Sequence, residues 1–319
     1  MKSCSVTASN WRRWRWSEGK PQLEIKRDLI FKPRQNFGRR QRRPDIPPIQ
    51  SGFANVNGAR LYYELAGSGT PFVMIHAGIA DCRMWEEEFE TFSQSHQALR
   101  FDMRGYGKSL PVEGEFNIQA DLEALLAKLD ISAPIILMGC SMGGGLSIDF
   151  ALSYPDRVAK LILVGSDPAG LELEAEWPDE LFAQSEAAFE AGDVERVAEL
   201  DMQIWFDGLG RSRHDVGPQA RRKAYAMAKL VAEHELKGIG THVRKTGARP
   251  AAEALHELTM PALIVIGEND LPYLKLAADY MTEKLPAATK LFIPNAGHLP
   301  NLEHPEVFRT AVLGFLGNC

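Results

Sequence analysis

Short apolar segments alternate with segments of helical periodicity along most of this chain, and this alternation is the strongest constraint on its fold. Each apolar segment is bounded by loop residues, which is typical of a strand that is buried on both faces. The predicted strands cover residues 72–76, 99–102, 135–139, 161–164, 262–266 and 289–293. Helical spacing of apolar residues lies between them, as in residues 118–129. This alternation predicts an α/β protein with a mostly parallel sheet and helices on both of its faces.

Two other segments complete the predicted architecture. Residues 53–64 contain Asn57-Gly58 between two short alternating runs, which favours a β-hairpin because the tight turn needs positive φ at both central residues. With this hairpin the expected sheet has eight strands. Residues 168–248 contain no strand-like run and predict several inserted helices. We therefore expect a tail over residues 1–50 and a helical cap over residues 168–248. The core is expected in two pieces, residues 51–167 and 249–319.

The first fifty residues differ from the rest of the chain in charge. They hold 13 Lys and Arg against 4 Asp and Glu, so a basic tail precedes an acidic body, and the whole chain has a net charge of −6. Three interpretations of this tail stay open: a disordered extension, a patch that contacts anionic membrane or nucleic acid, and an organelle-targeting peptide. The acidic body argues against nucleic-acid binding by the core.

The remaining composition is that of an ordinary globular enzyme. No apolar run approaches the roughly 20 residues that a membrane helix needs, and no apolar signal-peptide segment follows the early basic residues. The four cysteines are scattered, with no Cys-x-x-Cys pair and no Cys/His cluster at metal-ligand spacing. This pattern predicts free thiols, no zinc site and a cytoplasmic location.

A catalytic motif lies where a predicted strand meets a predicted helix. Residues 139–143 have the sequence Gly-Cys-Ser-Met-Gly, and a helical pattern starts at Met142. A sharp strand–turn–helix of this kind exposes the hydroxyl of its central serine, and the helix N-terminus favours developing negative charge. Ser141 is therefore the candidate nucleophile, and Cys140 is interpreted as a small buried side chain. A glycine-rich turn with an incidental serine is the alternative.

A serine nucleophile needs a general base that a third group orients. In the chain order serine, acid, histidine, the sequence offers Asp270 after the strand 262–266 and His298 after the strand 289–293. Both lie at carboxyl ends of predicted strands, where chemistry gathers in open α/β sheets. Asp270 is thus the candidate acid and His298 the candidate base.

Other titratable residues compete for these two roles. Glu268 lies two residues before Asp270, and Asp167 follows the strand before it, so each is an alternative acid. His76 lies in an early loop and His304 at a predicted helix start, and we interpret both histidines as structural.

The expected oxyanion hole uses the N–H of the residue after the nucleophile and an N–H of the first strand–helix loop. These positions are Met142 and Gly78, with Ala77 and Ile79 as alternatives in the loop. A simple turn without a catalytic role is the other interpretation of this loop.

Taken together, five stretches resemble the α/β-hydrolase superfamily, specifically its large branch with a helical cap. The resemblance runs from about residue 53 to the C-terminus and rests on residues 75–78, 101–109, 139–144, 267–270 and 297–305. It implies an α/β-hydrolase fold and a structural loop over 102–109. It also implies that Ser141 is the nucleophile, Asp270 the acid and His298 the base. The implied oxyanion hole is formed by Gly78 and Met142. Ala77 departs from the usual pattern of that loop, which leaves the exact oxyanion donor open.

Within this branch, residues 203–208 resemble a Trp-x-Asp-Gly run in the cap of 3-oxoadipate enol-lactonases, although an ordinary aromatic segment would look the same. The resemblance implies a serine hydrolase of small esters or lactones that needs no metal or organic cofactor. C–C bond hydrolysis, perhydrolysis and amide cleavage are alternative reactions for the same residues. A non-catalytic ligand-binding protein on a hydrolase scaffold is the alternative from another class, because a fold does not fix a function.

Overall fold

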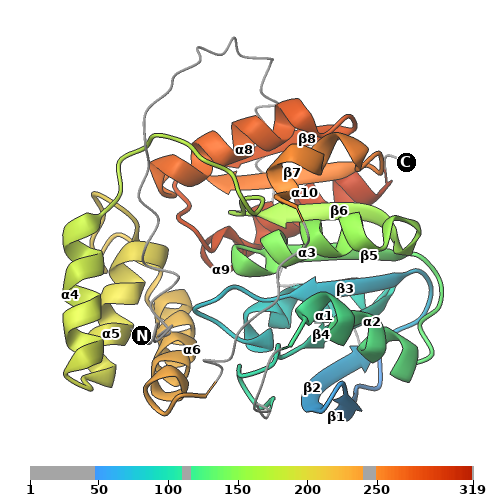
Figure 1. Cartoon of the computed structure of the whole chain (residues 1–319), viewed down its shortest axis with the longest axis horizontal. Helices are drawn as coiled ribbons and strands as arrows, with labels where there is room; N and C mark the ends of the chain where they lie inside the picture. The colour runs from blue at the N-terminus through green and yellow to red at the C-terminus, as the bar shows by residue number, and fades with distance from the viewer. Residues whose placement is uncertain (1–46, 110–115, 240–248, 318–319) are drawn as a thin grey trace, which may run out of the picture.

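The computed structural model describes residues 47–109, 116–239 and 249–317 (Figure 1), so nearly all of the predicted basic tail lies outside the described residues. In the described part, eight strands form one sheet in the order β1-β2-β4-β3-β5-β6-β7-β8. Strands β3 to β8 run parallel, and β1 and β2 are antiparallel to their neighbours. This confirms the predicted fold class. The strands are β1 (Gln50–Val56), β2 (Ala59–Ala66), β3 (Pro71–Ile75), β4 (Gln97–Phe101), β5 (Ile135–Cys140), β6 (Val158–Val164), β7 (Ala262–Gly267) and β8 (Ala288–Ile293).

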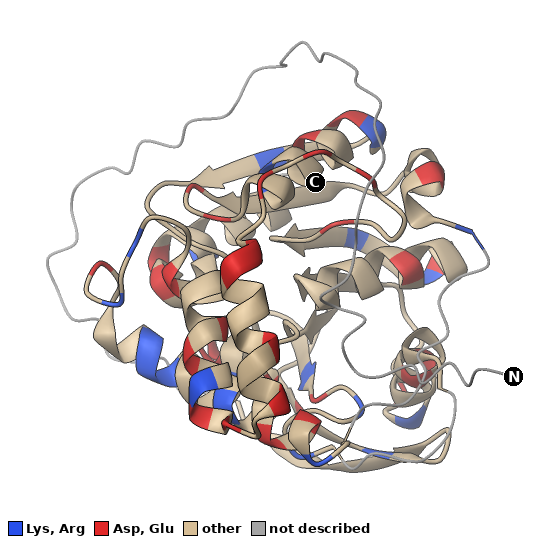
Figure 2. Cartoon of the chain, turned by 60° about the vertical axis from the view of Figure 1, so that its left-hand side comes forward, with Lys and Arg blue, Asp and Glu red and all other residues tan. Residues whose placement is uncertain are grey.

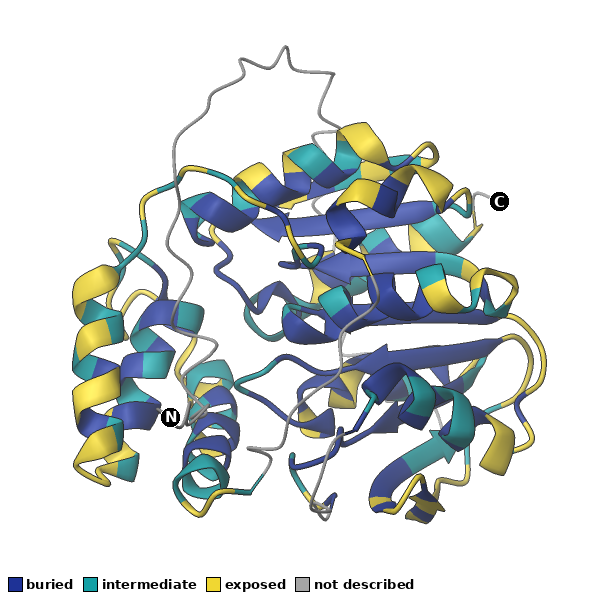
Figure 3. Ribbon diagram, viewed as in Figure 1, coloured by how far each residue is buried: buried dark blue, intermediate teal, exposed yellow. Residues whose placement is uncertain are grey.

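The central strands bury side chains on both faces, which explains their continuous apolar sequences. In β5, Ile135 and Leu137 belong to one apolar cluster and Ile136 and Met138 to the other, because successive side chains point to opposite faces. Figure 3 shows these strands as a buried layer between the helices. The first face is covered by α2 (Ile118–Lys128), α3 (Met142–Ser153) and α8 (Pro272–Lys284), and the second by α1 (Glu86–Phe92) and α10 (Pro305–Gly317).

The hairpin of β1 and β2 forms where the sequence predicts it. Asn57 and Gly58 form its turn with φ of 46° and 75°, the conformation that the Asn-Gly pair favours. Shorter helical segments connect other elements: η2 (Cys82–Trp85), η3 (Pro155–Arg157), η5 (Leu255–Glu257), α7 (Ala251–Ala254) and α9 (Pro300–Glu303). None of the helices in the described ranges is both long enough and apolar enough to cross a membrane.

The segment between β6 and β7 is helical in its described part. It contains α4 (Asp179–Glu190), α5 (Val194–Met202), the π-helix η4 (Gln203–Asp207) and α6 (Pro218–Leu236). These helices stand together at one end of the sheet, at the left in Figure 1 and turned toward the viewer in Figure 2. Val197, Leu200 and Ala232 form a small apolar cluster between them. We propose that this segment is a separate cap.

The buried carboxyl group of Glu88, on α1, gives the stability of the fold a pH dependence. Glu88 is 1% exposed, and its Oε2 accepts a hydrogen bond from Asn301 Nδ2 at 3.4 Å. Burial raises its pKa from 4.5 to about 7. The native state therefore binds more protons than the unfolded state between these values, so stability falls as the pH rises through this window.

Glu88→Gln is expected to remove this pH dependence. At about pH 8 the variant should be more stable than the wild type by up to about 3 kcal/mol, because no buried charge has to form. At about pH 4 the two should be equally stable. Urea unfolding across this pH range measures the difference, with Glu90→Gln on the same helix as the matched control. Parallel pH profiles for the wild type and Glu88→Gln would contradict the prediction.

Candidate active site

Ser141 lies in the sharp turn between β5 and α3. Its φ of 52° and ψ of −118° are rare for a residue with a side chain, which indicates a strained backbone held by its surroundings. The Ser141 N–H donates to the carbonyl of Val164 at 2.8 Å, and its own carbonyl accepts from Gly144 and Gly145. The turn is therefore fixed from both sides, by the neighbouring strand and by the first turn of the helix.

The glycines of this motif are required by close backbone contacts. A Cβ atom on Gly139 would lie 2.2 Å from the carbonyl oxygen of Gly143. A Cβ atom on Gly143 would lie 2.5 Å from the carbonyl oxygens of Ile75 and His76. The start of α3 therefore packs directly against the loop after β3, which brings Ser141 close to that loop.

His298 and Asp270 form a buried pair at the carboxyl ends of β8 and β7. His298 Nδ1 lies 3.0 Å from both carboxylate oxygens of Asp270, and Asp270 also accepts from the Leu271 N–H at 2.8 Å. A carboxylate in contact with Nδ1 favours the tautomer with its proton there, which leaves Nε2 as the acceptor. Within the described residues His298 Nε2 is buried and has no hydrogen-bond partner. This is the arrangement that a general base needs.

The turn at Ser141 and the histidine pair are neighbours. Gly165, directly after the residue that bonds Ser141, packs against the pair: a Cβ there would lie 2.9 Å from His298 Nδ1 and 3.0 Å from Asp270 Oδ2. Cys140 Sγ lies 3.9 Å from the His298 carbonyl oxygen. No hydrogen bond joins the Ser141 hydroxyl to His298 among the described residues. The catalytic contact between serine and histidine therefore stays a prediction.

The two alternative acids are engaged elsewhere. Asp167 Oδ2 lies 3.1 Å from the Tyr273 hydroxyl, and burial raises the pKa of this carboxyl. Glu268 Oε2 accepts the Asn295 N–H at 2.8 Å. In the described structure, the carboxylate that hydrogen-bonds His298 is Asp270.

The two predicted oxyanion donors lie side by side. A Cβ atom on Gly78 would be 3.7 Å from the Met142 Cβ, so the loop after β3 faces the start of α3. The alternative donor Ala77 directs its N–H to Met84 Sδ at 3.2 Å. His76 is fully buried, and its Nε2 accepts the N–H of Met103 at 3.0 Å, as expected of a structural histidine.

The stretch 102–109 is held by a carboxylate. Asp102 accepts the N–H groups of Cys82 at 2.8 Å and Lys108 at 2.7 Å. One carboxylate oxygen of Asp81, one of Asp102 and the Cys82 Sγ lie within 4.8 Å of one another. The Asp81 carboxylate, however, accepts hydrogen bonds from the Arg83 guanidinium. These oxygens organise the loop, and we assign no metal to them.

A row of aromatic side chains lies next to His298, and most of its members were not predicted from the sequence. The Trp205 ring lies 5.0 Å from the His298 ring, and Phe182 lies 6.0 Å from Trp205. Trp177 continues the row, 6.0 Å from Phe182 and 4.9 Å from Tyr273. The sequence does show several aromatic residues in the inserted segment. It does not show which way their side chains point, because tertiary packing sets that direction.

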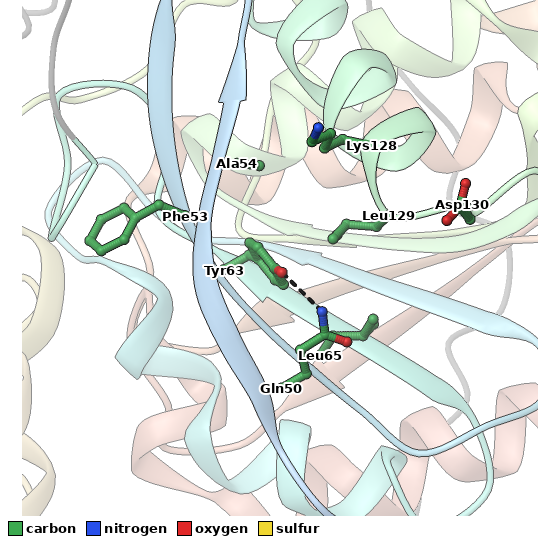
Figure 4. A pocket seen from close by; sticks show the side chains of 8 residues that line it. All are labelled: Gln50, Phe53, Ala54, Tyr63, Leu65, Lys128, Leu129 and Asp130. Carbon is green, nitrogen blue, oxygen red and sulfur yellow. Dashed lines mark hydrogen bonds between the residues drawn. The ribbon is translucent and has the colours of Figure 1, made fainter.

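A pocket of about 210 Å³ lies away from these residues, between the β1–β2 hairpin and the end of α2 (Figure 4). Tyr63, Lys128 and Asp130 are among its lining residues. It contains none of the candidate catalytic groups, so we do not assign the substrate to it.

Comparison with known proteins identifies the family of the chain. The family model for the alpha/beta hydrolase fold matches residues 70–305. The chain is 27% identical to a pimeloyl-[acyl-carrier protein] methyl ester esterase of Nitrosomonas europaea, over 78% of this chain and 97% of that protein. It is 26% identical to a 2-hydroxy-6-oxo-6-(2'-aminophenyl)hexa-2,4-dienoic acid hydrolase of Metapseudomonas resinovorans, over 83% and 90%.

Solved structures share the fold at lower identity. The enol-lactonase of Burkholderia xenovorans superposes with a TM-score of 0.67 at 20% identity, over 84% of this chain and all of that one. The family match covers most of the chain and includes every candidate site residue. The protein therefore belongs to the alpha/beta hydrolase fold family.

Proposed function

We propose that this hydrolase cleaves a small carboxylic ester or lactone through an acyl-enzyme intermediate on Ser141. The observation that carries the proposal is the buried His298–Asp270 pair, whose Nε2 has no hydrogen-bond partner among the described residues. Cys140, directly before Ser141, lies 3.9 Å from the His298 carbonyl oxygen through its Sγ. The names of the relatives, an ester esterase and an enol-lactonase among them, support carboxylic esters as the substrate class.

In the first half of the proposed reaction, the Ser141 hydroxyl attacks the carbonyl carbon while His298 Nε2 takes its proton. Asp270 keeps the imidazole oriented and offsets its positive charge. The N–H groups of Met142 and Gly78 donate to the developing oxyanion. When the tetrahedral intermediate collapses, His298 returns the proton to the leaving alcohol oxygen, and the acyl group stays on Ser141.

In the second half, water replaces the alcohol. His298 Nε2 takes a proton from the water as its oxygen attacks the acyl carbon, and the same oxyanion donors stabilise the second tetrahedral intermediate. The proton then returns to Ser141 Oγ, which leaves as the free hydroxyl, and the carboxylic acid is released. A lactone follows the same steps, with the alcohol and the acid remaining in one product.

The test combines labelling and turnover. A fluorophosphonate is expected to label the protein once, on the peptide that contains Ser141. A panel of methyl esters, aryl esters and simple lactones should then show turnover, with a burst of alcohol where deacylation is slow. The absence of both labelling and turnover would favour the ligand-binding alternative. The dienoic acid hydrolase among the relatives is the reason to include a C–C substrate, whose faster turnover would replace the ester proposal.

A further inference from the structure

Arg211 lies after the π-helix η4 and reaches from the inserted segment to the loop that carries His298. Its side chain is 13% exposed, and it donates five hydrogen bonds. They go to the carbonyl oxygens of Asp207 (2.5 Å), Asn295 (2.7 Å) and Phe206 (3.0 Å), and to Glu303 Oε2 (2.9 Å) and Oε1 (3.3 Å). A guanidinium has five N–H donors, so every donor of Arg211 is used.

Glu303, at the end of α9, completes this arrangement. It is 4% exposed, its Oε1 accepts the Gly297 N–H at 2.6 Å, and both of its oxygens contact Arg211. A buried carboxylate is costly unless it is paired and hydrogen-bonded. Arg211 supplies the opposite charge and Gly297 supplies a hydrogen bond. The ion pair therefore stabilises the backbone beside His298, and that backbone stabilises the ion pair.

The bonded groups surround His298 on two sides. Asn295 and Gly297 belong to the loop immediately before His298, so this loop is held through its backbone. Phe206 directly follows Trp205, whose ring packs 5.0 Å from the imidazole. The Arg211 guanidinium thus bonds to the backbone of the loop before His298 and to the backbone of the residue that follows Trp205.

From this geometry we propose that Arg211 and Glu303 are positioning residues for His298. They join the inserted helical segment to the base-carrying loop, so that the imidazole keeps its place between Asp270 and Ser141. The proposal rests on the proposed function, in which His298 is the base. Neither residue has to touch the substrate in this role.

Arg221 provides a matched control in the same segment. It binds the side chains of Asp207 at 2.8 Å and Glu199 at 2.8 Å, and its side chain is also 13% exposed. Among the described residues, its hydrogen bonds go to these two side chains and not to the loop before His298. Substitutions of Arg211 and Arg221 therefore both break a part-buried ion pair of the inserted segment, but only one of them loosens the histidine loop.

The kinetic test compares Arg211→Ala with Arg221→Ala. Arg211→Ala is expected to lower kcat by about 10²-fold or more with a much smaller change in KM, because a small misplacement of a catalytic group has such an effect. Added guanidinium at a non-denaturing concentration should restore part of kcat. Arg221→Ala should keep kcat within a few-fold of the wild type and show no rescue. Equal kcat values for the two variants would overturn the proposal.

A second variant guards against misfolding. Arg211→Lys keeps the charge but not the planar five-donor fork, so it should remain folded and still lose kcat. Glu303→Gln still offers one side-chain oxygen to the Gly297 N–H, so its kcat should fall less than that of Arg211→Ala.

A spectroscopic readout separates this proposal from the proposed function. The His298 Nδ1–H bonded to Asp270 should give a low-field proton NMR signal, assigned by its loss in His298→Ala. Arg211→Ala should broaden or lose the signal, and Arg221→Ala should keep it. A wild type with this signal but no turnover of any ester would count against the proposed function alone. An unchanged signal in Arg211→Ala would overturn the positioning role.

Discussion

Replacing Ser141 with alanine is expected to lower kcat for ester hydrolysis by about 10⁵- to 10⁶-fold, the loss that follows removal of a nucleophile in serine hydrolases. The variant should remain folded, because alanine has the same Cβ atom and the unusual φ of 52° is held by backbone hydrogen bonds. Labelling by the fluorophosphonate should disappear together with turnover.

Cys140 is the matched control for this substitution. It is fully buried, and burial raises the pKa of its thiol well above the ordinary value, so a thiolate is not available there. Cys140→Ala should keep activity within a few-fold of the wild type. The double variant Ser141→Ala/His298→Ala should be no slower than Ser141→Ala alone, because the two groups act as a unit. Full activity in Ser141→Ala would refute the assignment.

The sheet could be predicted from the sequence because its physical signal is local. A strand buried on both faces must be apolar at every position, and β5 and β7 show this directly. The hairpin was equally predictable, since Asn57 and Gly58 adopt the positive φ values that their residue types tolerate.

The candidate site was predictable where chemistry follows topology. Parallel strands bring their carboxyl ends to one edge, so residues after β5, β7 and β8 had to meet. Arg211 and Glu303 had no such signal. They are 92 positions apart, and their pairing depends on how the inserted helices pack on the core. The same holds for Trp177 and Phe182, whose ring directions no periodicity specifies.

The identity of the acid gives the second large expected effect. Asp270→Asn should lower kcat by about 10⁴-fold, because an amide in contact with His298 Nδ1 favours the wrong tautomer and cannot offset the imidazolium charge. Asp167→Asn should lower kcat less than about 10-fold. Steady-state kinetics of the two variants on one good ester substrate make the comparison.

Asp167 is the sharper control because it is also close to the histidine. The positive charge on His298 would stabilise its carboxylate, yet burial acts more strongly and raises the pKa of Asp167. The Tyr273 hydroxyl lies 3.1 Å from Asp167 and 3.0 Å from the carbonyl of Leu171, but it has a single proton. The hydroxyl can therefore donate to only one of these two oxygens at a time, and no hydrogen bond joins Asp167 to His298 in the described structure.

Asp167 is hydrogen-bonded to Tyr273 and Asp270 is hydrogen-bonded to His298, and this is why we expect the loss of Asp167 to be mild. Asp167→Asn replaces the acid with an amide whose oxygen can still accept from the Tyr273 hydroxyl, so the local packing should survive. Asp270→Asn has no such compensation, since Asp270 contacts Nδ1 with both oxygens. A loss of about 10⁴-fold in Asp167→Asn, with near-normal kcat in Asp270→Asn, would transfer the role of the acid from the end of β7 to the end of β6.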